Sequence, residues 1–249
     1  MIILKTENLN KVYQTNSRLN HVVSDCNIEV GYGEFVAITG LKGCGKSTLL
    51  RLLGGLDKPT SGKVLLKERD LYSLDSQEMQ ILYRKRIGMI LQDYQLISGL
   101  TVYENIVMPV LISHGLPESG YLRELTDSLH ISGVLHRYPK NLTKEQRQCT
   151  AIARALVNQP EIILADDPTK NLNKELAKDI LDLLMNYISW YRRTLIIATQ
   201  DPDIIIFADH VIHLNMGRVV TDRKIRRQQS GVRIKQLSNL NINRMIIKQ

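Results

Sequence analysis

The chain has 249 residues, of which 43% are hydrophobic and 23% charged, and its formal net charge is +8 at neutral pH. These proportions are ordinary for a globular protein and exclude a collagen-like, mucin-like or wholly disordered chain. No apolar run approaches the ~20 residues that cross a bilayer, and the N-terminus does not have the pattern of a signal peptide. The three cysteines, Cys26, Cys44 and Cys149, are widely spaced, which favours a reducing compartment over a disulfide or metal framework. We therefore expect a soluble intracellular protein.

The first half of the chain predicts strands that alternate with helices. Residues 34–39 form a short apolar run between glycines, which is typical of a buried strand. The leucines in 47–53 are spaced for a helix that ends at Gly54. Residues 63–66 and 86–91 are two further candidate strands.

The second half predicts a helical insert followed by more strands. Residues 100–158 are mainly helical in pattern, while 161–165 and 194–199 are apolar runs closed by polar residues. Residues 174–191, between those two runs, have helical spacing. Strands that alternate with helices indicate one α/β domain with a mostly parallel sheet. We place the helical insert at about residues 93–158.

The positive charge is concentrated at the C-terminal end. From Arg218 onward, nine Lys and Arg residues face a single acid, Asp222, so that residues 1–217 carry equal numbers of basic and acidic side chains. We assign residues 1–220 to the domain and 221–249 to a basic tail. Such a tail is either a solvated extension or a contact for anionic lipid or nucleic acid.

A glycine-rich run after the first predicted strand is the strongest chemical signal. Its residues are Gly40, Leu41, Lys42, Gly43, Cys44, Gly45, Lys46, Ser47 and Thr48. This spacing, between a strand and a helix, is that of a P-loop, whose backbone N–H groups and helix N-terminus bind phosphates. Lys46 is then expected to reach the β- and γ-phosphates, and Ser47 to hold Mg²⁺. The alternative is a glycine-rich turn that binds nothing.

Two consecutive acids supply the second part of such a site. Asp166 and Asp167 follow the apolar run 162–165. We expect Asp166 to reach Mg²⁺ through water and Asp167 to face an attacking water molecule. Strand ends often carry a capping Asp, so this pattern is weak evidence by itself. It indicates a metal site only because the same chain has a P-loop.

Four motifs in this order resemble the nucleotide-binding domain of an ABC transporter over roughly residues 2–220. They are the P-loop at 40–48, Gln92 after an apolar strand, the segment 142–146, and Asp166-Asp167-Pro168-Thr169. The phrases 100–105 and 165–172 are similar to the branch that exports lipoproteins, macrolides and antimicrobial peptides.

The resemblance implies a P-loop NTPase fold with a RecA-like, mostly parallel sheet, an N-terminal antiparallel β subdomain and an inserted helical subdomain. It implies that Tyr13 stacks on adenine, although an ordinary half-buried strand tyrosine is the alternative. Gln92 would contact Mg²⁺ and the attacking water, and the loop from Gln92 to Asn105 would meet a membrane partner; the alternative for Gln92 is a polar strand end. Two domains would enclose two ATP molecules, each P-loop being closed by the signature segment of the other, here around Thr143 and Gln146.

The implied partners follow from the same resemblance. We expect a separate transmembrane permease subunit and a second ATP-binding domain, in a homo- or heterodimer. The chain would then be cytoplasmic and peripheral on the cytoplasmic face of the cell membrane, held there indirectly. ATP and Mg²⁺ are the implied cofactors, and nucleic acid is not a favoured partner.

The sequence departs from the family pattern at the residues that carry hydrolysis. The family signature Leu-Ser-Gly-Gly-Gln is replaced here by Leu142-Thr143-Lys144-Glu145-Gln146. Thr143 and Gln146 keep the spacing of a capping box, so we expect the helix start to survive. The two lost glycines would have allowed close backbone approach to the γ-phosphate, and Glu145 adds a negative charge there.

Four further departures accompany the altered signature. The usual catalytic Glu is Asp167, the switch His is Gln200, the inter-subunit Asp is Asn173, and the preceding Gly is Lys170. Misplacement of a catalytic group by about 1 Å can cost on the order of 10²-fold in rate. We therefore expect an ABC-type ATPase with complete binding residues and reduced hydrolysis, although Asp and Gln could also be tolerated replacements.

Three functions remain open at this point. The first is an ATP-driven transporter subunit, and the second is an ATP-binding regulatory subunit that hydrolyses poorly; turnover measured against binding separates these two. The third is a soluble ABC ATPase acting on nucleic acid or ribosomes; only the basic tail favours this function. Salt-sensitive nucleic-acid binding that is lost on truncation after Gly217 would indicate the third function.

Overall fold

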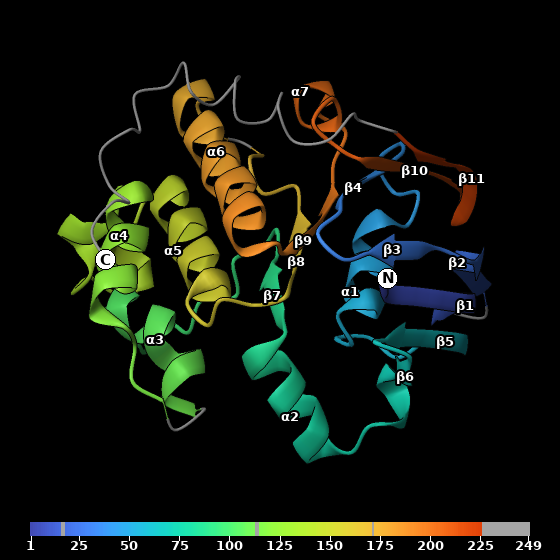
Figure 1. The fold of residues 1–249 in the computed structure, drawn as a ribbon, viewed down its shortest axis with the longest axis horizontal. Coiled ribbons are helices and arrows are strands. Elements are labelled where there is room, and N and C mark those ends of the chain that lie inside the picture. Colours follow the sequence, from blue (N-terminus) through green and yellow to red (C-terminus); the bar gives the residue numbers. More distant parts are fainter. Residues whose placement is uncertain (16–17, 113–114, 171, 226–249) are drawn as a thin grey trace.

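Two sheets, placed side by side, organise the fold (Figure 1). The computed structural model describes residues 1–15, 18–112, 115–170 and 172–225. Most helices lie on the side of the central sheet that faces away from the other sheet. None of the described helices is both long enough and apolar enough to span a membrane.

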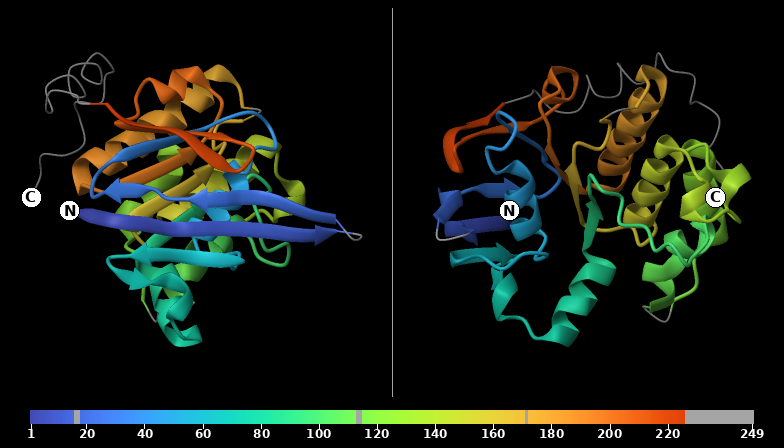
Figure 2. Two further views of the ribbon diagram at one scale, coloured as in Figure 1. Left: turned by 90° about the vertical axis from the view of Figure 1, so that its right-hand side faces the viewer. Right: turned by 180° about the vertical axis from the view of Figure 1, so that it is seen from behind.

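The N-terminal sheet is antiparallel and has the strand order β2-β1-β5-β6, with β3 paired to β1. Its strands are β1 (Ile2–Thr15), β2 (Arg18–Cys26), β3 (Glu29–Gly31), β5 (Ser61–Leu66) and β6 (Arg69–Asp70). Figure 2 shows the long β1–β2 hairpin along one side of the molecule, with β11 beside it.

The central sheet has the order β11-β10-β4-β9-β8-β7, and every neighbouring pair is parallel except β10–β11. Its strands are β4 (Phe35–Thr39), β7 (Ile87–Ile90), β8 (Ile162–Asp166), β9 (Thr194–Ala198), β10 (His210–Asn215) and β11 (Arg218–Lys224). All residues of β4, β8 and β9 are buried, which explains their continuous apolar sequences.

Helices cover both faces of the central sheet. The helices are α1 (Lys46–Leu53), α2 (Ser76–Lys85), α3 (Val102–Ile112), α4 (Ser119–Ser128), α5 (Lys144–Leu156), α6 (Lys174–Tyr191) and α7 (Pro202–Ile205). Three 3₁₀ turns span Leu71–Ser73, Ser132–Val134 and Pro139–Asn141. Helices α3 to α6 bury their apolar sides against one face of the sheet, while α1 and the antiparallel sheet cover the other.

The structure confirms the α/β class, the mostly parallel sheet, the antiparallel β subdomain and the helical insert. Helix α6 begins and ends at the residues where the sequence predicts it, Lys174 and Tyr191. The proposed domain boundary at residue 220 falls inside β11, so that residues 221–224 belong to the central sheet. The rest of the proposed tail, from residue 226 onward, lies outside the described residues.

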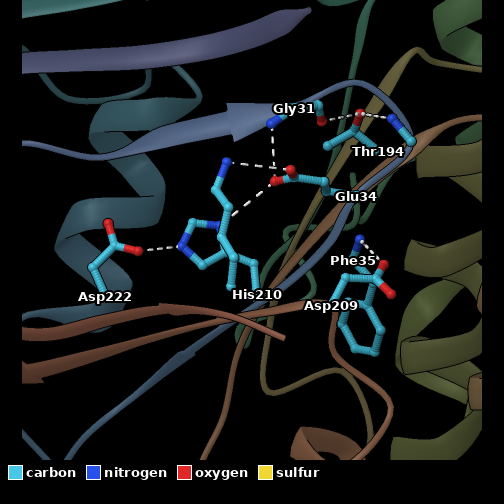
Figure 3. Close-up of polar contacts among 9 residues, drawn as sticks. Gly31, Glu34, Phe35, Thr194, Asp209, His210 and Asp222 are labelled. Carbon is cyan, nitrogen blue, oxygen red and sulfur yellow. Dashed lines mark hydrogen bonds and ion pairs between the residues drawn. The ribbon is translucent and has the colours of Figure 1, made fainter. Parts of the chain in front are cut away.

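A charge cluster around the buried His210 joins β11 to β10 and to the start of β4 (Figure 3). The side chain of His210 is 1% exposed, with Nε2 against a carboxylate oxygen of Asp222 and Nδ1 3.5 Å from Oε2 of Glu34. Glu34 also accepts a 2.9 Å hydrogen bond from the Gly31 N–H, and its Oε1 lies 3.4 Å from Nζ of Lys224.

The cluster stabilises the protonated form of His210. Burial lowers the pKa of His210, but the hydrogen bonds and charges of Glu34 and Asp222 outweigh that effect and raise the pKa above its usual 6.5. His210 in turn is the main reason that the pKa of Glu34 falls from 4.5 to about 2, against the opposing effect of burial. The contribution of His210 to stability is therefore present below pH 6.5 and lost as the pH rises through its folded-state pKa. That of Glu34 is present above 4.5 and is lost as the pH falls toward 2.

We predict that His210→Gln lowers the free energy of unfolding by about 1–3 kcal/mol near pH 6, because Asp222 loses a cationic hydrogen-bond partner and Glu34 loses a nearby positive charge. The loss should shrink as the pH is raised toward 9, because the contribution of His210 is lost as the pH rises through its folded-state pKa. Urea unfolding at the two pH values measures both effects, and the exposed His136→Gln serves as control. An equal loss at both pH values would show that His210 acts through packing alone.

Candidate nucleotide-binding site

The glycine-rich loop connects β4 to α1 and takes a shape that only glycine permits at its two ends. Gly40 has φ +141° and Gly45 has φ +106°. A Cβ at Gly40 would lie 2.2 Å from the carbonyl oxygen of Leu214, and a Cβ at Gly45 would lie 2.3 Å from that of Val22. The loop is therefore pressed between β10 and β2. Because Gly45 is the N-cap of α1 and has no side chain, the N–H groups of the first turn are free of a side-chain acceptor and suited to an anion.

Lys46 is folded back onto this loop. Its side chain is buried, and Nζ donates to the carbonyl oxygens of Gly40 at 2.7 Å and Leu41 at 3.0 Å. The amide nitrogen of Gln200, at the end of β9, donates to the same Gly40 oxygen at 2.7 Å. The fold thus brings Gln200, 160 residues away in the sequence, to the base of the P-loop.

Ser47 and Asp166 form the candidate metal site. Asp166 ends β8 and is 8% exposed. Its pKa is raised, first by burial and also by the neighbouring charge of Asp167, while a hydrogen bond from Ser47 opposes the rise. One hydroxyl and one acidic oxygen suit Mg²⁺, which keeps several water ligands when it binds a protein. Within the described ranges, no three His, Cys, Asp or Glu side chains come together as a metal cluster.

Asp167 follows β8 in the left-handed conformation, with φ 46°. Its N–H donates to the carbonyl oxygen of Ala198 at 2.9 Å, which fixes the backbone against β9. Its carboxylate lies 3.7 Å from Nζ of Lys170, in a partly exposed ion pair. The residue expected to act as general base is therefore engaged by the lysine that replaces a glycine of the family pattern.

The altered signature segment begins α5 with the capping box that the sequence predicts. The Thr143 hydroxyl accepts from the Gln146 N–H at 3.2 Å, and the Gln146 side chain accepts from the Thr143 N–H at 3.1 Å. Glu145 has a lowered pKa, caused first by hydrogen bonding to its own backbone N–H and then by Thr143. Helices α5 and α1 pack on opposite faces of the central sheet, so within one chain the signature does not close the P-loop.

Gln92 lies exposed in the loop after β7, and the residues that follow it are held by α5. Tyr94 and Gln95 have φ values of 58° and 45°. Their carbonyl oxygens each accept a 2.7 Å hydrogen bond from the guanidinium of Arg154. The sequence analysis assigned Arg154 no role. A charged residue among the apolar residues of a predicted helix could have indicated that it has a polar partner.

Tyr13 projects from β1 with 37% of its surface exposed. Its hydroxyl donates to Oδ2 of Asp57 at 3.0 Å and lies within hydrogen-bonding reach of Thr48, the last residue of the P-loop motif. Asp57 is a second residue to which sequence reasoning gave no role.

A family profile described as ABC transporter matches residues 23–170, which is more than half of the chain. The chain belongs to the ABC transporter family.

Relatives within this family cover most of the chain. The lipoprotein-releasing system ATP-binding protein LolD of Psychrobacter arcticus is 38% identical over 218 residues, which are 86% of this chain and 96% of that protein. The macrolide export ATP-binding/permease protein MacB 1/2 of Paracoccus denitrificans is 34% identical over 225 residues, but these are only 33% of its length.

Solved structures confirm the ABC cassette fold. The dimeric structure of MJ0796, a bacterial ABC transporter cassette, superposes with a TM-score of 0.85 at 32% identity and covers 91% of this chain and 100% of its own. A dimeric post-hydrolysis state of the same cassette, bound to ADP and Pi, gives a TM-score of 0.83. A protein named MJ0796 from Methanocaldococcus jannaschii is 34% identical over 230 residues.

We predict that Asp166→Asn stabilises this cassette in the absence of ligands but weakens its response to Mg-ATP. Removing a charge that burial disfavours should increase stability near neutral pH and so raise the melting temperature of the ligand-free protein. The added stabilisation by Mg-ATP should fall because the candidate metal site would lose its acidic oxygen. Thermal unfolding with and without Mg-ATP measures both, with the exposed Asp203→Asn as control. A destabilised apo variant would contradict the stated cause of the pKa shift.

Proposed function

We propose that this chain is an ATP-binding subunit of an ABC transporter, which binds Mg-ATP at its P-loop and couples nucleotide-dependent dimerisation to a separate membrane-spanning partner. One observation carries the proposal: Lys46 and Gln200 converge on the Gly40 carbonyl, beside the Ser47–Asp166 pair. A structural turn would not need a buried cation, a distant amide and a buried acid at one loop.

The binding step follows from these contacts. Phosphate oxygens would take the place of the Gly40 and Leu41 carbonyls as acceptors for Lys46, and the free N–H groups of α1 would bind the same anion. Ser47 and Asp166 would hold Mg²⁺, which neutralises charge on the phosphates when it is bound. The raised pKa of Asp166 supports this assignment, because a cation would offset its buried negative charge.

Hydrolysis in this chain is proposed to be slow. The backbone of Asp167 is tied to Ala198, so it cannot advance to offset a side chain that is shorter than Glu by about 1.5 Å. Lys170 lies 3.7 Å from the same carboxylate, and this ion pair would compete with a catalytic role for it. Gln200 can donate a hydrogen bond to a γ-phosphate oxygen, but it cannot carry a charge or accept a proton as His does.

The altered signature adds to this effect in a dimer. The N-terminus of α5 would face the γ-phosphate bound by the other subunit. The carboxylate of Glu145 folds back on that same N-terminus, where it offsets the positive end of the helix. Lys144, beside it, partly compensates by offering a cation.

A groove in the helical subdomain is our candidate for the permease contact. It has a volume of about 450 Å³ and is lined by Tyr103, Pro117, Ser119, Leu122, Arg123, Thr126, Asp127, Ser132 and Leu135. Leu111 and Leu116 are 50% and 88% exposed on the same subdomain, and exposed apolar side chains of this kind commonly mark a protein contact. The relative MacB 1/2 is named as an ATP-binding/permease protein, which supports a permease as the partner class for this contact.

Lipoprotein or macrolide export is the transport class suggested by the names of the relatives. A regulatory subunit that binds ATP without turnover is the second candidate, favoured by the Asp167–Lys170 pair. The nucleic-acid alternative depends on the basic tail, most of which lies outside the described residues.

Purified protein incubated with radiolabelled Mg-ATP should retain nucleotide, with ADP and phosphate forming slowly. Chromatography of the bound nucleotide over time measures this, and Lys46→Ala should retain none because the phosphates lose their buried cation.

Each other result has a defined meaning. Rapid conversion to ADP and phosphate would contradict weakened hydrolysis. Intact ATP with no phosphate release would identify the regulatory subunit. A folded wild type that retains nothing would contradict binding by the isolated chain, and the site would need a second subunit.

We further predict that Asp167→Glu combined with Gln200→His raises kcat for ATP by on the order of 10²-fold. The glutamate carboxylate would extend further than that of Asp167, and the histidine could accept a proton, which Gln200 cannot. Phosphate release and KM should be measured together, with Asp203→Glu as matched control. An unchanged kcat would show that these two positions do not limit the reaction.

A further inference from the structure

Tyr13 is held by polar contacts on more than one side. The ammonium of Lys11 lies 4.8 Å from the centroid of its ring, while the hydroxyl donates to Asp57 at 3.0 Å. Nζ of Lys11 also donates to the carbonyl oxygen of Lys58 at 2.6 Å, which fixes the lysine in place. A cation therefore lies over the ring, and the hydroxyl at the ring's end is anchored to a carboxylate.

Asp57 connects this tyrosine to the P-loop helix. Its Oδ2 accepts from Nε of Arg51, on α1, at 2.9 Å, and its Oδ1 lies 3.4 Å from the second guanidinium nitrogen. Its backbone is fixed as well, since its N–H donates to the Arg51 carbonyl at 3.3 Å and its own carbonyl accepts from the Tyr72 hydroxyl at 2.5 Å. A carboxylate held in this way defines where the Tyr13 hydroxyl must lie.

The bond between the two side chains is charge-assisted. Arg51 is the largest cause that lowers the pKa of Asp57, with Tyr13 adding to it and burial opposing it. Burial and Asp57 raise the pKa of Tyr13. At neutral pH an ionised carboxylate thus accepts from a protonated phenol, which is a stronger bond than one between two neutral groups.

We propose that Asp57 is a positioning residue that orders Tyr13 as the platform for the nucleotide base and so sets the base-dependent part of nucleotide affinity. The inference rests on the proposed function of the P-loop as an ATP site. A half-exposed tyrosine that is free to rotate would lose side-chain entropy when a base stacks on it. Ordering the ring beforehand removes that cost from binding, and the anchor on α1 aligns the ring with the phosphate loop.

The test compares ATP with inorganic tripolyphosphate, which has phosphates but no base. Affinities are measured by calorimetry in Mg²⁺ for wild type, Asp57→Asn, Tyr13→Phe and the double variant. The control is Glu7→Gln, a partly exposed acid on β1 that pairs with Lys5. Asp57→Asn and Tyr13→Phe should each weaken ATP binding by roughly 3- to 10-fold, with tripolyphosphate binding unchanged. The double variant should be no weaker than either single variant, because both remove the same bond. Glu7→Gln should match the wild type.

Other outcomes separate this inference from the function beneath it. If Asp57→Asn leaves ATP affinity unchanged, or weakens ATP and tripolyphosphate equally, Asp57 does not position the base platform and the inference is wrong. If the folded wild type binds tripolyphosphate as tightly as ATP, the P-loop binds phosphate without reading a base, which overturns both the platform and the ATP assignment. If it binds neither, the proposed function fails and the inference fails with it.

Discussion

Close backbone packing around the P-loop is the constraint on which the rest of the molecule depends. The loop can run between the carbonyls of Val22 and Leu214 only because Gly45 and Gly40 have no side chains there. The loop is therefore packed against β2 of the antiparallel sheet on one side and against β10 of the central sheet on the other. The two sheets therefore meet at this loop. The position of α1, which follows the loop, depends on both sheets.

In the proposed function, binding and hydrolysis would use groups from different elements. Binding would depend on backbone N–H groups, Lys46 and Ser47, all of which lie on the loop or the helix that it begins. Hydrolysis would depend on groups from other elements, such as Asp167 after β8 and Gln200 after β9. Substitutions at the ends of neighbouring strands can therefore change the reaction while the phosphate-binding geometry persists.

Much of this arrangement could be predicted from the sequence because local patterns carry it. The buried strands, α1, α6 and the capping box at Thr143 follow from apolar runs, periodicity and residue spacing. Helix α2 was not predicted, although its own capping box of Asp75 and Glu78 is visible in the sequence.

The tertiary partnerships could not be predicted in this way. The bond from Gln200 to Gly40 spans 160 positions, and the one from Tyr13 to Asp57 spans 44. No periodicity or motif spacing encodes such a pair, because it exists only after the strands have been ordered in the sheet. The charge cluster around the buried His210 likewise depends on β11 pairing antiparallel with β10.

Arg154 has a mechanical consequence for the helical subdomain. Its guanidinium is partly withdrawn from solvent and joins α5 to the carbonyls of Tyr94 and Gln95 through two short bonds. The loop that contains Gln92 and the helix headed by Thr143 therefore cannot shift independently without stranding a buried cation. A tilt of the N-terminus of α5, where the signature segment lies, would therefore also displace the loop that contains Gln92, because Arg154 links the two.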